Sequence, residues 1–406
     1  MKWLGPTWIN VDLDGIYRNL EQVRQYSKAL ICAVLKGDAY GHGAIAIGQF
    51  FEDQHVDYLA VSDLPEALEL REAGVRSPIL VLEPCLPHQA PEVIDLNLTA
   101  TVSSLEFITA LAKQALSKGK KTNVHLKIDT GMSRVGVPPS CALNVVQRIA
   151  ELPALKLEGI YSHFAAAYSD HDFTKKQLHA LLAVKEQLVG AGWNQLIWHS
   201  ANSAALLSFP ESHLDMVRIG TLLYGQSLVR VRPEFHLHPT WTLFSRIIQV
   251  KPVQKGESIG YGRTYTTRRP SIIGIIPIGY GDGLGVAPNQ NSHWQHIKTT
   301  ITSILDHPRK VMIDGISYPI VGKIAMGMCC IDLTNHSKAL DLYGAPVQIP
   351  TRRITVGKRI PKAYIINNKI RLISWRNRFW HPLCRNNQVY IKEIPFSKGK
   401  ELLHRR

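Results

Sequence analysis

Lys36 is the residue of this chain whose position most strongly indicates chemistry. It follows an apolar run, Ile31–Leu35, that has the composition of a buried β-strand, and a glycine-rich turn and a helix are predicted after it. A lysine at such a strand end is poorly solvated, so its pKa can fall. A neutral amine can attack an aldehyde, which favours a Schiff-base lysine. The simpler alternative is a strand-end lysine that only extends its ammonium group into solvent.

Other polar residues follow apolar runs of the same kind, where further strands would end. Active sites of α/β barrels lie at the carboxyl ends of the strands, so these residues are expected to meet at one rim. They are Asp129, Arg134, His163, His199, Asn202, Ser203, Arg218, Gly220 and Thr221.

A phosphate site is indicated within this set. Ser203 begins a predicted helix, and its hydroxyl and the first amides of that helix suit a phosphate. Gly220 would let the backbone approach an anion closely. Taken singly, a strand-end histidine is more often a buried core residue, and Ser203 is more often a helix cap. The prediction therefore depends on the convergence of the whole set.

Eight short apolar runs supply these positions, and most gaps between them have helical periodicity. Leu64–Gly74 is an example, with proline in its first turn and glycine at its end. Eight strands alternating with helices predict an α/β fold of the (β/α)8, or TIM, barrel type over residues 11–235; an open doubly wound sheet is the alternative. The runs are Ile31–Lys36, Asp57–Ser62, Pro78–Glu83, Leu98–Val102, Asn123–Ile128, Leu157–His163, Gln195–His199 and Asp215–Ile219.

After about residue 235 the helical periodicity largely disappears. Short strand-like runs and glycine-rich turns predict a C-terminal, mainly β domain over residues 236–376, to which residues 1–10 add a strand. Residues 377–406 are expected to form a basic C-terminal tail.

The net charge of +15 is concentrated near the C-terminus. Residues 351–406 hold 15 Lys and Arg against two Asp and Glu, so +13 of the charge lies there. Such a segment is usually solvated, and nucleic-acid or membrane-surface binding is a minority hypothesis. The interleaved aromatic residues Trp375, Phe379 and Trp380 keep that hypothesis open.

Nothing in the sequence predicts export or a membrane anchor. Met1–Asn10 lacks the apolar core of a signal peptide, and no window approaches the roughly 20 apolar residues of a membrane span. The six cysteines form no CxxC pair and no metal site is expected. A cytoplasmic location is therefore predicted.

Several segments resemble signature motifs of the bacterial alanine racemases, from about residue 7 to residue 349 and again over 357–376. No single motif is specific, but together they are. The motif segments are Ala33–Gly43, Leu126–Gly136, Tyr161–Phe164, His199–Ala205, Arg218–Gly220 with Leu223–Gly225, Ile259–Tyr265, Ile278–Gly283 and Val321–Met326.

This resemblance implies a racemase dependent on pyridoxal 5′-phosphate (PLP) that works as a homodimer with shared active sites. Lys36 would bind PLP and act on the D-enantiomer, and Tyr261 from the partner subunit would act on the L-enantiomer. Since tyrosine has a pKa near 10, Tyr261 needs positive neighbours such as His163, Arg218 or Arg263 to act as a base. A turn tyrosine between two glycines is the alternative.

The resemblance also implies the remaining roles. Tyr40, Ser203 and Gly220, with the nearby Asn202 and Thr221, would hold the phosphate. Arg218 would meet the ring nitrogen, with His163 and His199 around it. A guanidinium keeps its proton, so the ring would be a weaker electron sink and transamination would be disfavoured. Arg134 and the backbone of Met326 would bind the substrate carboxylate, Lys127 matches a lysine that is often carbamylated, and Tyr280 matches a gate at the substrate entrance.

Two features depart from the family pattern. Gly327 stands where the family usually has aspartate, and the β domain is expected to be truncated at residues 350–357, where the family carries a tyrosine that contacts the phosphate. Tyr364 lies on the wrong side of the match to replace it.

The function predicted from the sequence is interconversion of L-alanine and D-alanine, which supplies D-alanine for peptidoglycan. The substrate would be a small amino acid, with no membrane partner and nucleic acid not favoured. A racemase of another amino acid (serine or lysine) and an impaired PLP-binding relative are the alternatives.

Overall fold

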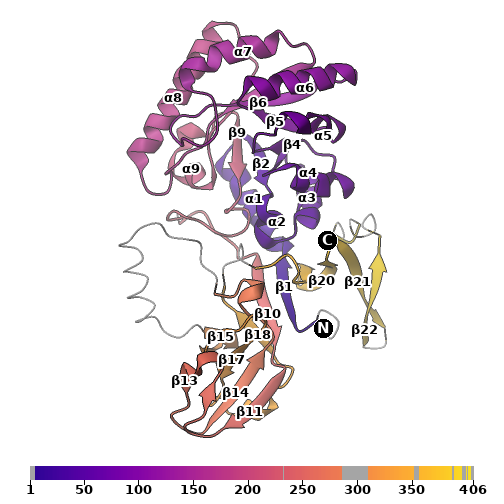
Figure 1. Ribbon diagram of the computed structural model, residues 1–406, viewed down its shortest axis with the longest axis vertical. Helices are drawn as coiled ribbons and strands as arrows, with labels where there is room; N and C mark the ends of the chain where they lie inside the picture. The colour runs from indigo at the N-terminus through magenta and orange to yellow at the C-terminus, as the bar shows by residue number, and fades with distance from the viewer. Residues whose placement is uncertain are drawn as a thin grey trace. The chain divides into compact units, whose positions relative to one another are not determined.

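The computed structural model describes residues 5–231, 233–285, 310–351, 356–385, 388–395, 399 and 401–403, with the backbone alone for 383–385 and 388–391. The chain consists of two compact units (Figure 1). One consists of Asp14–Pro239, and the other of Met1–Leu13 with Thr240–Arg406. We call them the barrel unit and the β unit and describe each by itself.

Eight parallel strands form the barrel unit, in the spatial order β8-β7-β6-β5-β4-β3-β2-β9. The ends of this ladder lie together, because the Asp215 amide donates to the Trp198 carbonyl (2.9 Å) and the Arg218 amide donates to the Ala201 carbonyl (3.0 Å). The predicted (β/α)8 barrel is therefore confirmed in a nearly closed form. Its strands are β2 (Leu30–Val34), β3 (Tyr58–Val61), β4 (Ile79–Val81), β5 (Thr99–Val102), β6 (Thr122–Lys127), β7 (Leu155–Tyr161), β8 (Ile197–His199) and β9 (Met216–Ile219).

Helices connect these strands and lie outside them (Figure 1). In α7, the buried residues Ala142, Val145, Val146 and Ile149 follow the spacing of one helix face, so that this face packs on the strands. The helices are α1 (Leu13–Tyr26), α2 (Lys36–Gly41), α3 (Ala44–Asp53), α4 (Leu64–Glu72), α5 (Ala90–Asp95), α6 (Leu105–Ser117), α7 (Ala142–Ala150), α8 (His171–Gly190) and α9 (Ser203–Ser208).

The β unit is built on a twelve-stranded sheet with the order β11-β14-β17-β16-β15-β18-β10-β1-β19-β20-β21-β22, and β12 and β13 form a separate pair. The opening strand β1 lies inside this sheet, antiparallel to β10 and parallel to β19. The strands are β1 (Thr7–Asp12), β10 (Trp241–Arg246), β11 (Gln249–Val253), β12 (Ser258–Ile259), β13 (Tyr265–Thr266), β14 (Ser271–Ile276), β15 (Lys310–Ile313), β16 (Ile316–Val321), β17 (Cys329–Asp332), β18 (Pro346–Ile349), β19 (Lys362–Ile366), β20 (Lys369–Trp375), β21 (Arg378–Arg385) and β22 (Gln388–Ile394).

The segment expected to be a basic tail continues this sheet. β21 pairs antiparallel with β20, and β22 pairs antiparallel with β21 over seven residue pairs. The physical reason is alternation, because Phe379 is buried while Arg378 is exposed and Trp380 is half-buried. One face of β21 can thus join the core, although net charge dominates the composition of the segment.

The remaining expectations about this unit fall partly outside the described residues. The predicted truncation at 350–357 includes residues 352–355, which the structure does not describe. Tyr364 is fully buried on β19 and its hydroxyl lies 3.2 Å from Ser374 Oγ, so it is a core residue. Within the described ranges, no helix is long and apolar enough to cross a membrane.

Candidate active site

A cavity of about 700 Å³ opens beside the carboxyl ends of the barrel strands. Its volume is in the range that holds a small ligand or cofactor. Ten residues singled out from the sequence line it, which are Lys36, Tyr40, Lys127, Arg134, His163, Asn202, Ser203, Arg218, Gly220 and Thr221. His199 lies behind Arg218 rather than in the lining. The barrel thus brings together side chains that are up to 185 positions apart, because all follow or end strands of one parallel sheet.

The turn that carries Lys36 has an unusual backbone. Gly37, Asp38, Ala39 and Tyr40 all have positive φ between 52° and 64°. For the three residues other than glycine this conformation is costly, and it persists only where surrounding contacts impose it. Those contacts include the Gly37 amide donating to Glu66 Oε1 (2.7 Å) and Asp38 Oδ1 accepting from the Ala44 amide (2.8 Å).

Lys36 itself faces the cavity and makes no hydrogen bond among the described residues. Burial lowers its pKa, the Arg134 and Arg218 charges lower it further, and Glu66 acts in the opposite direction. This shift is in the direction of the neutral amine that a nucleophilic lysine requires.

A cradle of polar groups in the cavity lining is formed by Ser203 at the start of α9, Gly220 directly after β9, and Tyr40 in α2. Ser203 Oγ accepts hydrogen bonds from the Gly220 amide (3.1 Å) and the Leu222 amide (3.4 Å). A Cβ at Gly220 would collide with the Tyr40 hydroxyl, so any larger residue here would require the Tyr40 ring to move. Burial raises the pKa of Tyr40 to about 12, which keeps its phenol protonated as a donor.

The helix after β8 begins at Ser203, as the sequence predicts. The cap of α9 is Asn202, whose side-chain oxygen accepts from the amides of Ala204 (3.1 Å) and Ala205 (3.0 Å). Those two amides therefore already have a partner. Ser203 remains in the lining, but as a hydroxyl group beside Gly220 rather than as the cap.

Arg218, in β9, is the most deeply buried cation of the site. One terminal nitrogen lies 2.8 Å from His199 Nδ1, and the other donates to the Ser162 carbonyl (2.8 Å) and lies 3.2 Å from His163 Nδ1. Its guanidinium carbon lies 4.9 Å from the centre of the Tyr161 ring. Among the described residues no carboxylate forms an ion pair with it, so its charge is not neutralised by the protein. A cavity with this property suits an electron-rich acceptor group.

A chain of buried hydrogen bonds leads from Arg218 into the barrel. Because a guanidinium only donates, His199 Nδ1 must accept, and its Nε2–H then donates to His125 Nδ1 (2.9 Å). The remaining His125 nitrogen carries a proton and lies 3.5 Å from Glu158. Gly159 makes room for this chain, since a Cβ there would be 2.8 Å from His125 Cε1.

Both histidines beside Arg218 have lowered pKa values. Burial, followed by the charge of Arg218, holds the pKa of His163 and that of His199 well below the usual value. This direction does not favour His163 as one of the positive neighbours expected for Tyr261. The low dielectric of the barrel core overrides the ordinary pKa of the residue.

Lys127 and Arg134 add two more cations to the cavity. Burial and the charges of Arg218 and Arg134 lower the pKa of Lys127 to about 8. Arg134 is held by a loop whose geometry depends on Asp129, because Asp129 Oδ1 accepts from three successive amides, those of residues 131–133, each at 3.0 Å. Burial alone would raise the pKa of Asp129, but these bonds lower it.

Sequence reasoning missed the residues that support the site from behind. Tyr161 stacks on His199 with ring centres 4.7 Å apart, and its hydroxyl lies 2.8 Å from Thr101 Oγ1. Glu158 accepts from Tyr58 (2.9 Å) and Asn123 (2.9 Å). The available signal was a run of polar residues inside otherwise apolar strands, such as His125 and Lys127 two positions apart in β6.

The other predicted residues lie in the β unit. Tyr261 lies in a single helical turn between β12 and β13, and its side chain is 75% exposed. The Tyr280 amide donates to the Ala325 carbonyl (3.0 Å) and the Gly281 amide donates to the Met326 carbonyl (2.9 Å). The turn with Tyr280 and the loop with Met326 are thus joined. Gly327, in the same loop, has open space where a Cβ would be.

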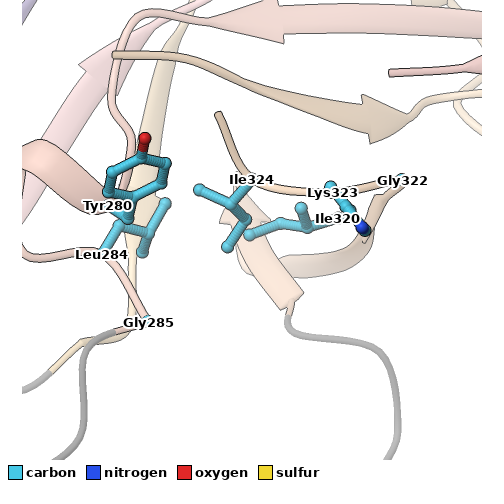
Figure 2. A pocket seen from close by; sticks show the side chains of 7 residues that line it. All are labelled: Tyr280, Leu284, Gly285, Ile320, Gly322, Lys323 and Ile324. Carbon is cyan, nitrogen blue, oxygen red and sulfur yellow. The ribbon is translucent and has the colours of Figure 1, made fainter. Parts of the chain in front are cut away.

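A hollow of about 430 Å³ lies beside Tyr280. Figure 2 shows Tyr280 and Leu284 facing Ile320 and Ile324 across it, with Lys323 beside them.

Comparisons with known proteins agree with this description. The family model "Alanine racemase, N-terminal domain" matches residues 11–228, and "Alanine racemase, C-terminal domain" matches residues 240–371. Alanine racemase 1 of Caldanaerobacter subterraneus subsp. tengcongensis is 37% identical over 335 residues, 81% of this chain and 82% of that protein. Alanine racemase of Desulfovibrio desulfuricans is 34% identical over 382 residues, 89% of this chain and 98% of that protein.

Solved structures give the same result. Alanine racemase of Clostridium difficile 630 superposes with a TM-score of 0.81 at 32% identity, covering 91% of this chain and 98% of that one. The Bacillus anthracis enzyme with bound L-Ala-P superposes with a TM-score of 0.79 at 29% identity, with the same coverage.

Proposed function

We propose that this chain, which belongs to the alanine racemase family, interconverts L-alanine and D-alanine with PLP as its cofactor. The observation that carries the proposal is Lys36, an amine with a lowered pKa at the mouth of a cavity that also holds the uncompensated Arg218. The similar proteins are named as alanine racemases, which does not favour serine or lysine as the substrate.

The residues present fit PLP. Lys36 would hold it covalently, and Tyr40, Ser203, Gly220 and Thr221 would hold its phosphate. Two observations support the fit. Gly220 approaches the Tyr40 hydroxyl closely, and the buried guanidinium of Arg218 has no ion pair among the described residues. When bound, PLP would accept electron density from the Cα of the substrate after a proton is removed.

Racemisation requires one group to remove a proton from Cα and another to return a proton on the opposite face. We assign the first role for the D-enantiomer to Lys36, whose lowered pKa favours the neutral, proton-accepting amine. We assign the opposite face to Tyr261. Its exposed phenol in the β unit is suited to a site that a second copy of the chain completes. The proposed assembly is therefore a homodimer with shared active sites.

Arg218 would control the electronics of the reaction. Its guanidinium does not release its proton, so it would donate a hydrogen bond to the ring nitrogen of PLP and leave that nitrogen unprotonated. The neutral His163 and His199 hold the guanidinium in place from its other side. This arrangement favours return of the proton to Cα over side reactions.

Substrate binding would use the remaining cations. Arg134 and the backbone of Met326 would bind the carboxylate, and Tyr280 would narrow the entrance. Lys127, with its pKa of about 8, is partly neutral at physiological pH and can react with carbon dioxide; a carbamate there would neutralise the excess positive charge beside Arg134.

The product would supply D-alanine for peptidoglycan. A cytoplasmic location is supported by the free thiols of Cys32, Cys85, Cys141, Cys329 and Cys330.

The test is D-alanine formation from L-alanine by the purified protein with added PLP. We expect turnover in the wild type and in Lys113→Ala, a surface control on α6, and none in Lys36→Ala. Borohydride reduction followed by peptide mass spectrometry should find PLP on Lys36 alone. PLP on Lys36 without turnover of alanine would contradict the substrate assignment and lead to serine and lysine as the next substrates. No PLP on Lys36 would contradict the proposal as a whole.

A further inference from the structure

The chain continues past the residues that the family models match. The C-terminal domain model ends at residue 371, and the end of β20, all of β21 and all of β22 follow it. The turn between β20 and β21 brings together a cluster that we call the basic tip, which consists of Arg359, Trp375, Arg376, Arg378 and Trp380. We propose that the basic tip binds single-stranded nucleic acid, a function separate from racemisation.

Arginine planes lie over the two tryptophans of the tip. The guanidinium carbon of Arg376 is 4.9 Å from the ring centre of Trp375, and that of Arg378 is 5.8 Å from the ring centre of Trp380. The two indole rings are 6.4 Å apart and inclined by 37°. Nucleic-acid bases stack on aromatic rings and on guanidinium planes alike, so this surface offers both kinds of stacking partner.

The position of Trp375 is fixed by the fold. Its Nε1 donates to the Arg359 carbonyl (2.8 Å), so its polar edge is satisfied, while 42% of the residue remains exposed. Trp375 also pairs directly with Arg378 across the β20–β21 ladder. A ring held in place in this way binds a base with little loss of conformational entropy.

The tip has charge available for phosphates. Among the described residues, neither Arg359 nor Arg376 takes part in an ion pair, and Arg378 pairs only with Glu393 (2.7 Å). The segment 351–406 as a whole carries a net charge of +13. Phosphates of a nucleic-acid strand would neutralise this charge and release counterions.

The two tryptophans of the tip differ in exposure. Trp375 is exposed, whereas the half-buried Trp380 also packs against the core cluster of Trp8, Ala363 and Ile373. On the opposite face of the same strands, Leu372 and Phe379 are buried. A membrane surface would require the indoles to enter the lipid, whereas here a charged guanidinium group lies beside each ring. A single strand, which has both phosphates and accessible bases, fits this arrangement better.

Fluorescence anisotropy of labelled 20-nucleotide single-stranded DNA and RNA, titrated with the full-length protein, tests the proposal. We expect saturable binding that weakens about 20-fold between 50 and 200 mM salt if three phosphates are contacted. Trp375→Ala should weaken binding about tenfold or more, and Trp375→Phe, which keeps a ring, should stay within about threefold of the wild type. A duplex of the same length should bind more weakly, because its bases are not accessible.

The charge contribution has its own matched control. Arg359→Gln/Arg376→Gln removes two cations from the tip and should reduce the salt slope by about 1.4. Lys113→Gln/Lys121→Gln removes two exposed cations from the barrel unit and should leave the slope unchanged. All four variants should retain alanine racemisation, which also shows that they fold.

Three outcomes would overturn the proposal. The first is the absence of oligonucleotide binding by the wild type, with or without binding to phosphatidylglycerol vesicles; vesicle binding would instead assign the tip to an anionic membrane surface. The second is equal loss in the tip and barrel double variants, which would indicate only a general charge effect. The third is unchanged binding by Trp375→Ala.

Discussion

His199 Nε2 and His125 Nδ1 lie 2.9 Å apart inside the barrel, and this contact joins the proposed active site to the far part of the strands. Arg218 can only donate, so it sets the donor and the acceptor of each hydrogen bond in the series from Arg218 through His199 to His125. At the other end Glu158, a carboxylate, faces the last N–H. A cation and an anion thus fix the tautomers of two neutral imidazoles between them.

Glu158→Gln should therefore destabilise the protein without removing the cofactor site. The charge facing His125 is lost, and we expect the free energy of unfolding at pH 7 to fall by about 1–3 kcal/mol. Bonds from His125 and Tyr58 lower the pKa of Glu158 against the effect of burial, so its stabilisation is present above its ordinary pKa. The deficit should shrink as pH falls through that lowered value. Urea unfolding at several pH values measures it, with the exposed Glu151→Gln as control; a deficit independent of pH would contradict the argument.

Lys127→Met should stabilise the protein at neutral pH. The folded-state pKa of Lys127 is lowered to about 8 from 10.5, so the unfolded chain binds the extra proton between these values and stability rises with pH there. Below pH 8 the fold holds a buried ammonium, which after solvent screening costs on the order of 2 kcal/mol. Urea unfolding without PLP and in carbon-dioxide-free buffer should show the largest gain at pH 7 and little at pH 10. A gain of equal size at both pH values would mean that only better packing is involved.

Gly220→Ala should impair the cradle by a steric effect alone. The added Cβ collides with the Tyr40 hydroxyl, and displacing that ring costs about 1–3 kcal/mol. We expect PLP affinity to fall about tenfold or more in equilibrium dialysis. Gly190→Ala, on α8 with open space around its Cβ, is the matched control and should bind PLP normally. Tyr40→Phe in the Gly220→Ala background should relieve the collision only in part, because the Tyr40 Cζ would still lie 2.9 Å from the new Cβ.

Mixing two inactive variants tests the shared active site. Lys36→Ala and Tyr261→Phe should each be inactive alone, since each lacks one proton-transferring group. After subunit exchange, half of the dimers are hybrids, and each hybrid has one complete site if Tyr261 acts across the interface. We expect recovery of about a quarter of wild-type activity. If both groups act within one chain, mixing should restore nothing, which would falsify the shared-site assignment.

The sequence was sufficient to predict the barrel. Its strands are buried on both sides, so each is a short apolar run, and regular alternation with helical segments is visible without any long-range information. The same logic predicted that Lys36 and Arg218 would lie in one cavity, because strand ends must meet at one rim once the sheet closes. For the segment after residue 376 the prediction failed, since high net charge concealed the alternation that places Phe379 in the core and Arg378 outside it.

Only the tertiary structure decided the electrostatics of the site. Neither the lowered pKa of His163 nor that of Lys127 follows from residue type, since both depend on burial and on cations brought close by other strands. The supporting residues Tyr161, His125 and Glu158 were likewise invisible, because a polar residue inside a strand has no partner in its own segment. Sequence pattern determines which residues point into the barrel, and the closing of the barrel determines which of them touch.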